Sequence, residues 1–235
     1  IEGHPNNTTI EQMQVLFDKG FRRISFGVQD NDPIVQKIIN RIQAFENVVR
    51  VTKEAREIGF ESVNYDLIYG LPKQTLLGME RTIEQVISLK PDRIAYYSYA
   101  HVPWTSKGQR LFDENDLPNP EKKLQLYLLG KRMLTDAGYT DIGMDHFSKK
   151  DDELAIAKEN KQLHRNFQGY NTLKTTGQVY AFGASGISQL NGAFAQNIKA
   201  YDKYIQAIES DGFAVDRGYI LNNEEIIVRD SINQI

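Results

Sequence analysis

Polar side chains follow two apolar, strand-like segments in the first half of the chain. Gln29 and Asp30 end the run Ser25-Phe-Gly-Val-Gln-Asp30, and Asp66 comes just before Gly70. A carboxylate in such a place can accept two hydrogen bonds from a diol such as a ribose. It can equally make an N-cap or a loop salt bridge, and position alone leaves both open. Gln29 is likewise a ligand contact or a strand-end amide bonded to its own loop.

Other candidate groups are one arginine, four histidines and one loop that combines polar, cationic and aromatic residues. Arg41 can pair bidentately with a carboxylate or simply be solvated. No two histidines have a zinc-ligand spacing, so we expect no metal site. His146, beside Asp145, could titrate near neutrality or orient a substrate, or it is a satisfied semi-buried histidine. The string His164-Arg-Asn-Phe-Gln-Gly-Tyr170 suits a planar or anionic ligand, or a packed surface loop.

Strand-like and helix-like segments alternate in the first half, and these elements must position the candidates. The strands are expected at 24–29, 62–68 and 93–99, and the helices at 10–17, 44–58 and 76–86. Thr8 and Glu11 have the spacing of a capping box. The alternation predicts parallel βαβ units, in a (β/α) barrel or an open doubly wound sheet. Ligands of either fold bind at the carboxyl ends of the strands, which here hold Gln29, Asp66 and Ala100.

The second half is less regular. Asn119 and Pro120 are an N-cap and first-turn pair that opens a helix running to Gly138. We expect a strand at 140–147, a short helix near 151–158, mostly loop and short strand at 169–192, and helices at 200–209 and from 224 onward.

Composition narrows the class of protein. Hydrophobic content is 40%, charged content 25% and net charge −3, which are ordinary for a globular protein and favour neither nucleic acid nor a membrane as partner. No apolar run approaches the roughly 20 residues that span a bilayer, and we expect no secretion signal. We expect a cytoplasmic monomer. With no cysteine, this chain has neither disulfides nor thiolate metal ligands. Its two ends read as cuts, so we expect a piece of a longer chain.

Five strings together resemble the oxygen-independent coproporphyrinogen III oxidases (dehydrogenases) of the radical S-adenosylmethionine (SAM) superfamily. They are residues 25–30, 64–74 (Asn-Tyr-Asp-Leu-Ile-Tyr-Gly-Leu-Pro-Lys-Gln), 99–101, 143–147 (Gly-Met-Asp-His-Phe) and 164–170. The last two are the most specific to this family. The resemblance implies an α/β fold in which 1–117 form the later strands of a partial (β/α) barrel. Residues 118–235 would be a smaller α+β region, truncated at its C-terminal end.

The resemblance also implies an activity and its cofactors. A [4Fe–4S] cluster reduces SAM to a 5′-deoxyadenosyl radical, which takes hydrogen from a propionate of coproporphyrinogen III. Loss of CO₂ and an electron leaves a vinyl group, and two such rounds give protoporphyrinogen IX. An electron donor for the cluster is a further partner. Two SAM molecules are expected, and the residues matching their contacts are Glu2, Gln29, Arg41, Asp66, Ile68, Ala100, Gln168 and Ile187. His146 receives no defined role.

Two departures from the family pattern matter. The family's usual Glu-Ile-Asp-Pro is here Glu2-Gly-His-Pro5. The family's cysteine loop and glycine-rich segment are absent from this chain, and without the cysteines this chain alone should be inactive.

Two alternative functions stay open. One is a non-catalytic relative that carries SAM or haem. The other is an unrelated (β/α) barrel acting on a sugar phosphate, for which the chain has no convincing phosphate loop.

Overall fold

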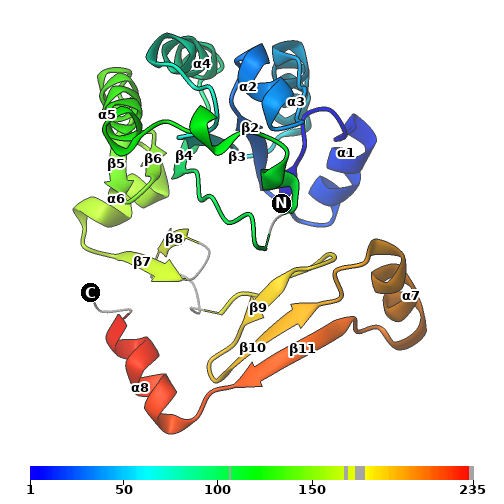
Figure 1. Ribbon diagram of the computed structural model, residues 1–235. Helices are drawn as coiled ribbons and strands as arrows, with labels where there is room; N and C mark the ends of the chain where they lie inside the picture. Colours follow the sequence, from blue (N-terminus) through cyan, green and yellow to red (C-terminus); the bar gives the residue numbers. More distant parts are fainter. Residues whose placement is uncertain (106, 167–168, 173–177, 233–235) are drawn as a thin grey trace. The chain divides into compact units, whose positions relative to one another are not determined.

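The computed structural model describes residues 1–105, 107–166, 169–172 and 178–232. They form two compact units, Ile1–Ile156 and Ala157–Ile235 (Figure 1). The domain boundary expected between residues 117 and 118 rests on the family resemblance and stays a prediction.

The first unit alternates strands with helices. Its strands are β1 (Glu2–Gly3), β2 (Arg23–Gln29), β3 (Ser62–Tyr69), β4 (Arg93–Ser98), β5 (Thr140–Gly143) and β6 (His146–Ser148). Its helices are α1 (Ile10–Asp18), α2 (Pro33–Ile38), α3 (Phe45–Ile58), α4 (Leu76–Ser88) and α5 (Pro120–Asp136), and α6 (Glu153–Glu159) crosses into the second unit. Two short 3₁₀ turns, Lys107–Arg110 and Glu114–Asp116, lie between β4 and α5.

The six strands form one sheet in the order β1-β2-β3-β4-β6-β5. The first four are parallel and neighbours in sequence order. Right-handed crossovers that always step in one direction must place their helices on the same face. Figure 1 shows α1, α3 and α4 together on one side of the sheet. This is the winding of a barrel, whereas a doubly wound sheet carries helices on both faces.

Local sequence signals explain where the helices begin and end. The side chain of Asn119 accepts a hydrogen bond from the Lys122 amide, and Gly59 ends α3 in the left-handed conformation at φ 110°. The expected capping box was displaced by one residue. Thr9, not Thr8, is the N-cap of α1, and its partner is Gln12.

The prediction of a single strand at 140–147 was wrong. The segment is a hairpin in which β6 runs antiparallel to both β4 and β5. Gly143 and Met144 make the turn with φ of 138° and 48°. A glycine that adopts positive φ freely explains why the chain reverses there. The hairpin brings His146 beside β4.

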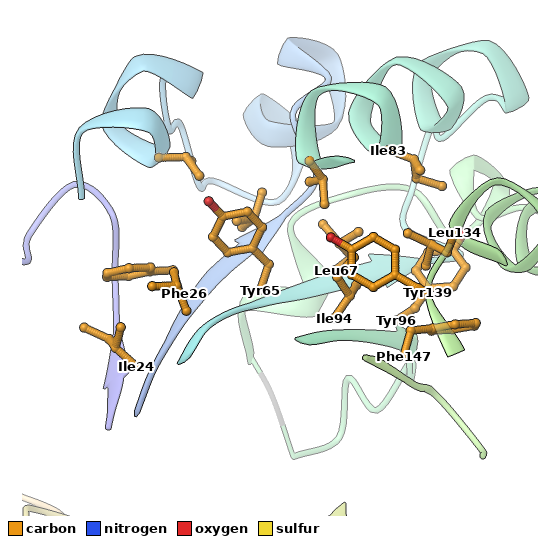
Figure 2. Packing of buried hydrophobic residues seen from close by; sticks show 14 of the residues in the cluster. Ile24, Phe26, Tyr65, Leu67, Ile83, Ile94, Tyr96, Leu134, Tyr139 and Phe147 are labelled. Atoms are coloured by element: carbon orange, nitrogen blue, oxygen red, sulfur yellow. The ribbon is translucent and has the colours of Figure 1, made fainter. Parts of the chain in front are cut away.

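The hydrophobic core lies between the sheet and its helices. Alternate residues of β2, β3 and β4 point toward the helices and are buried, as Figure 2 shows for Phe26, Tyr65 and Tyr96. The intervening residues of each strand face the opposite side of the sheet. We call this side the open face, and it is where the polar residues of the strands gather.

The second unit has little core of its own. It contains the hairpin β7 (Leu163–Asn166) and β8 (Gly169–Thr172), the sheet β9 (Ile187–Gln189), β10 (Ala193–Asn197) and β11 (Val215–Ile220), and helices α7 (Tyr201–Asp211) and α8 (Asn223–Ile232). The two helices agree with the expected ones. Within the described parts of the chain, every helix is too short or too polar to cross a lipid bilayer.

Candidate functional site

A row of side chains crosses the open face of the sheet. Strand register places four residues next to one another: Gly27 of β2, Asp66 of β3, Ala95 of β4 and His146 of β6. Asp66 therefore stands between two small residues, so side chains from other segments can approach its carboxylate. The aspartate was expected where a strand ends. It lies instead inside β3, three residues before the last, and faces outward because of the strand's two-residue alternation.

The surroundings of Asp66 raise the pKa of its carboxyl group toward neutral pH. Burial raises the pKa of Asp66 to about 6, and the nearby Glu2 carboxylate adds to the rise. A hydrogen bond of 3.2 Å from the Ser25 hydroxyl and the positive charge of Arg41 act in the opposite direction. At pH 7 the group is mostly ionised, so it can accept hydrogen bonds with both oxygens.

Gln29 and Arg41 reach the same place from different segments. Gln29 ends β2 with a left-handed φ of 65°, and Arg41 lies in the loop between α2 and α3. A Cβ built on Gly27 would stand 2.8 Å from both the Arg41 Nη2 and the Gln29 Nε2 atoms. The two side chains therefore converge over Gly27, the register neighbour of Asp66. A side chain at position 27 would force both of them to shift.

Arg41 retains hydrogen-bonding capacity for a ligand. Its Nη2 donates to the Gly27 carbonyl at 2.7 Å. Its Nε is buried and has no hydrogen-bond partner among the described residues. A guanidinium has five donors in a planar fork, so a carboxylate is its natural further partner. This is the pairing that the sequence predicted, and it stays a prediction.

Glu2, Ile68 and Ala100 complete the part of the predicted site that lies in the first unit. Glu2 is the register neighbour of Ser25 on the open face, which explains its effect on Asp66. Ile68 follows Asp66 by two residues in β3 and so shares its face. Ala100 lies just after β4 and is exposed, with its carbonyl held by the Gln109 side chain at 3.1 Å.

The remaining two predicted contacts lie outside the described residues of the first unit. Gln168 lies outside the described residues. Ile187 lies in β9 of the second unit. Both stay predictions that rest on the family resemblance alone.

One neighbour of the row, and one buried amide in the loop after β2, were missed by sequence reasoning. Tyr97 lies on the open face of β4, edge-on to His146 with ring centroids 5.9 Å apart. Burial, with Asp66 and Glu2, raises the pKa of Tyr97 to about 12, so its hydroxyl stays a donor. The side-chain amide of Asn31 is buried, and neither of its polar atoms has a hydrogen-bond partner among the described residues. Alternation along β4 was a signal for Tyr97, whereas nothing local marked Asn31.

The chain is similar to known proteins along its whole length. Residues 1–86 match the model of the Radical SAM superfamily. The oxygen-independent coproporphyrinogen III oxidase of Helicobacter pylori strain J99 is 46% identical, over 98% of this chain and 50% of that protein. The Escherichia coli K12 protein of the same name is 42% identical, over 100% of this chain and 51% of its own length.

A solved structure agrees with the sequence relatives. Coproporphyrinogen III oxidase from Escherichia coli, described as a radical SAM enzyme, matches with a TM-score of 0.86 at 42% identity, covering 99% of this chain and 54% of its own. The chain thus spans about half the length of these relatives. The resemblance and the α/β partial-barrel fold expected from the sequence are confirmed.

The donor set of the site can be matched to the groups of a ligand. Asp66 and Gln29 offer oxygen and amide groups suited to a ribose diol, while Ile68 offers an apolar surface. Arg41 and Glu2 are a cation and an anion on the same side, as a zwitterionic amino-acid group requires. The arrangement suits an amino acid joined to a nucleoside.

Proposed function

Because this chain is a relative, along its whole length, of the oxygen-independent coproporphyrinogen III oxidases of the radical SAM superfamily, we propose that the protein containing it decarboxylates coproporphyrinogen III. Two propionates would become vinyl groups, giving protoporphyrinogen IX in anaerobic haem synthesis. The observation that carries the proposal is the convergence of Gln29 and Arg41 over Gly27, beside Asp66. That cluster is the donor set that SAM needs.

Six residues of the first unit have a binding task in this proposal. Arg41 holds the SAM carboxylate and Glu2 its ammonium. Asp66 and Gln29 hold the ribose hydroxyls, while Ile68 and Ala100 pack against the adenosyl group. When bound and reduced, SAM supplies a 5′-deoxyadenosyl radical that abstracts hydrogen. The protein's contribution is to hold the ligand in one orientation, with its charges and hydroxyls paired.

The [4Fe–4S] cluster is not fitted by these residues. The 235 residues contain no cysteine, and the described residues contain no group of three potential metal ligands. Cluster ligands must come from elsewhere in the protein, and we derive no step through the cluster from this chain. A second SAM contacting Gln168 and Ile187, an electron donor, a monomeric state and a cytoplasmic location belong to the same proposal.

The proposal is tested with the full-length protein, purified and reconstituted without oxygen. Protoporphyrinogen IX formation from coproporphyrinogen III is expected, and SAM binding without product would instead support a carrier.

Asp66→Ala should weaken SAM binding by about 1–3 kcal/mol, because the ribose donors lose their acceptor. Equilibrium dialysis measures this, with Asp136→Ala as control, since Asp136 is exposed at the end of α5. Unchanged SAM affinity in Asp66→Ala would remove Asp66 from the site.

A further inference from the structure

A buried polar network lies under the strand ends that carry the proposed cofactor site. Its five side chains are at most 6% exposed and come from three separate segments: Asp30, Gln36, Gln43, Gln74 and Thr82. Buried polar groups are costly unless each finds a partner, so a cluster of five demands an explanation. None of the five belongs to the predicted cofactor contacts.

Gln74 uses its whole hydrogen-bonding capacity within this network. Its Nε2 donates to the Asp30 carboxylate at 2.6 Å and to the Ile68 carbonyl at 2.7 Å. Its Oε1 accepts from the amides of Gly70 and Leu71 at 2.6 and 2.9 Å. A primary amide has two donors and two acceptor sites, and here all four are occupied. Gln74 thereby clamps the end of β3 to Asp30.

The Asp30 carboxylate acts only as an acceptor. Besides the bond from Gln74, its Oδ1 accepts from the Asp32 amide at 2.7 Å and the Thr82 hydroxyl at 2.9 Å. Thr82 lies in α4, so the carboxylate joins the loop after β2 to that helix. Burial raises the pKa of Asp30, and these three donors oppose the rise by stabilising the ionised form.

Gln36 extends the network to the loop that carries Arg41. Its Nε2 donates to the carbonyls of Asp30 and Gln43 at 2.9 and 2.8 Å, and its Oε1 accepts from the Gln43 amide at 2.9 Å. The backbone carbonyl of Gln36 accepts from the amide of Arg41 at 2.8 Å. The backbone of Arg41 is therefore held by the same network as Asp30.

The network is attached to three proposed cofactor contacts at once. It bonds the carbonyl of Ile68, it holds the backbone of Arg41, and it fixes Asp30, the residue after Gln29. Gln29 adopts a left-handed φ, a conformation that a non-glycine residue keeps only when its surroundings hold it. We propose that Asp30 and Gln74 are positioning residues of the SAM site, with opposite donor and acceptor roles that cannot be changed singly. This inference rests on the proposed function.

Moving the carboxylate from one partner to the other tests the pair. Asp30→Asn turns an amide N–H₂ toward the N–H₂ of Gln74, and Gln74→Glu sets a second carboxylate against Asp30. Each change alone therefore removes the pairing of a donor with an acceptor between positions 30 and 74. In the double variant, the amide introduced at position 30 can donate to the carboxylate introduced at position 74, which still accepts from the Gly70 and Leu71 amides. The bond to Ile68 is lost, a carboxylate oxygen faces that carbonyl instead, and the net charge is unchanged.

SAM affinity of the full-length protein, measured by equilibrium dialysis at pH 8 and pH 6, is the readout. At pH 8, the SAM affinity of each single variant should be at least tenfold lower than that of wild type. The SAM affinity of the double variant should return to within about threefold of wild type. Compared with wild type at the same pH, Gln74→Glu should lose much less affinity at pH 6 than at pH 8, because one proton shared between two facing carboxylates removes their repulsion. Gln85→Glu, a partly exposed change on the same helix as Thr82, is the matched control and should bind like wild type.

Two results would overturn the pairing. One is a folded single variant that binds SAM with wild-type affinity. The other is a double variant whose fold-decrease in SAM affinity equals the product of the decreases in the two single variants. If the single variants do not fold, Thr82→Val removes one donor to Asp30 and should weaken SAM severalfold, and unchanged affinity there also rejects the inference. Wild-type protein that does not bind SAM would instead reject the proposed function.

Discussion

In the proposed function, Asp66 serves binding at a cost to stability. Its carboxylate lies half-buried beside Glu2, and its pKa of about 6 is higher than the roughly 3.9 of an exposed aspartate. The native state therefore takes up a proton between about pH 4 and pH 6. The free energy of unfolding falls as pH rises through that window, because the charged form is poorly solvated. A residue kept in such a position is typical of a functional site.

Asp66→Asn should separate these two effects. Wild-type affinity for SAM is expected to fall as pH drops through about 6, because the protonated carboxyl loses its charge and an acceptor site. The variant should bind more weakly at pH 8, with little change in affinity between pH 8 and 5. Equilibrium dialysis of the full-length protein across this range measures both curves.

The same substitution has a second readout in chemical denaturation. An amide removes the buried charge, so at pH 8 the variant should gain about 1–3 kcal/mol of unfolding free energy, and near pH 4 little or none. A variant that is less stable than wild type at pH 8, or that keeps the wild-type pH profile of binding, would contradict this account of Asp66.

At the scale of elements, helix α5 meets the sheet at unusually short range. A Cβ on Gly130 would stand 2.4 Å from the Tyr96 ring. That ring is fully buried, and its hydroxyl donates to the Leu126 carbonyl at 2.8 Å, so it cannot move aside without losing the bond. The glycine is present because β4 and α5 need close contact, despite the low helix propensity of glycine.

Gly130→Ala is therefore expected to destabilise the chain. Alanine favours a helix by about 1 kcal/mol, but overpacking against a fixed ring costs about 1–3 kcal/mol, so we expect a net loss. Thermal and denaturant unfolding measure it. Gly192→Ala is the matched control, because nothing lies within 4 Å of its Cβ position. An unchanged or higher midpoint for Gly130→Ala would mean that the ring relaxes freely.

At the scale of the whole molecule, burial is distributed unevenly between the two units. The main hydrophobic cluster lies entirely between Met13 and Phe147, within the first unit. In the described part of the second unit, Ala214 is the one buried hydrophobic residue after Ala157. Large apolar side chains such as Phe182, Phe213 and Ile220 are about four-fifths exposed there. Stability of the chain should therefore come from the first unit.

Expression of two segments checks this difference. Residues 1–160, which keep α6 intact, should unfold cooperatively with a near-UV circular dichroism signal from packed aromatic rings. Residues 161–235 should lack a cooperative transition, because they bury too little apolar surface to offset their conformational entropy. A cooperative melt of the second segment by itself would contradict the expectation.

Local patterns in the sequence determined most elements and the side of the sheet that each residue faces. Ile24, Phe26 and Val28 alternate with open-face residues, and Gly59 and Asn119 mark helix ends, because these signals depend on near neighbours. The short helix α2 was missed although Asp32 and Pro33 are an N-cap and first-turn pair.

Only the tertiary structure decided which of these residues act together. The bond between Asp30 and Gln74 joins groups 44 residues apart, and no local pattern distinguishes them from surface polar residues. Strand register set Asp66 beside Gly27, and the β5–β6 hairpin brought His146 into the same row. Such pairings depend on crossover direction and close packing across the whole sheet, which a single segment of sequence does not contain.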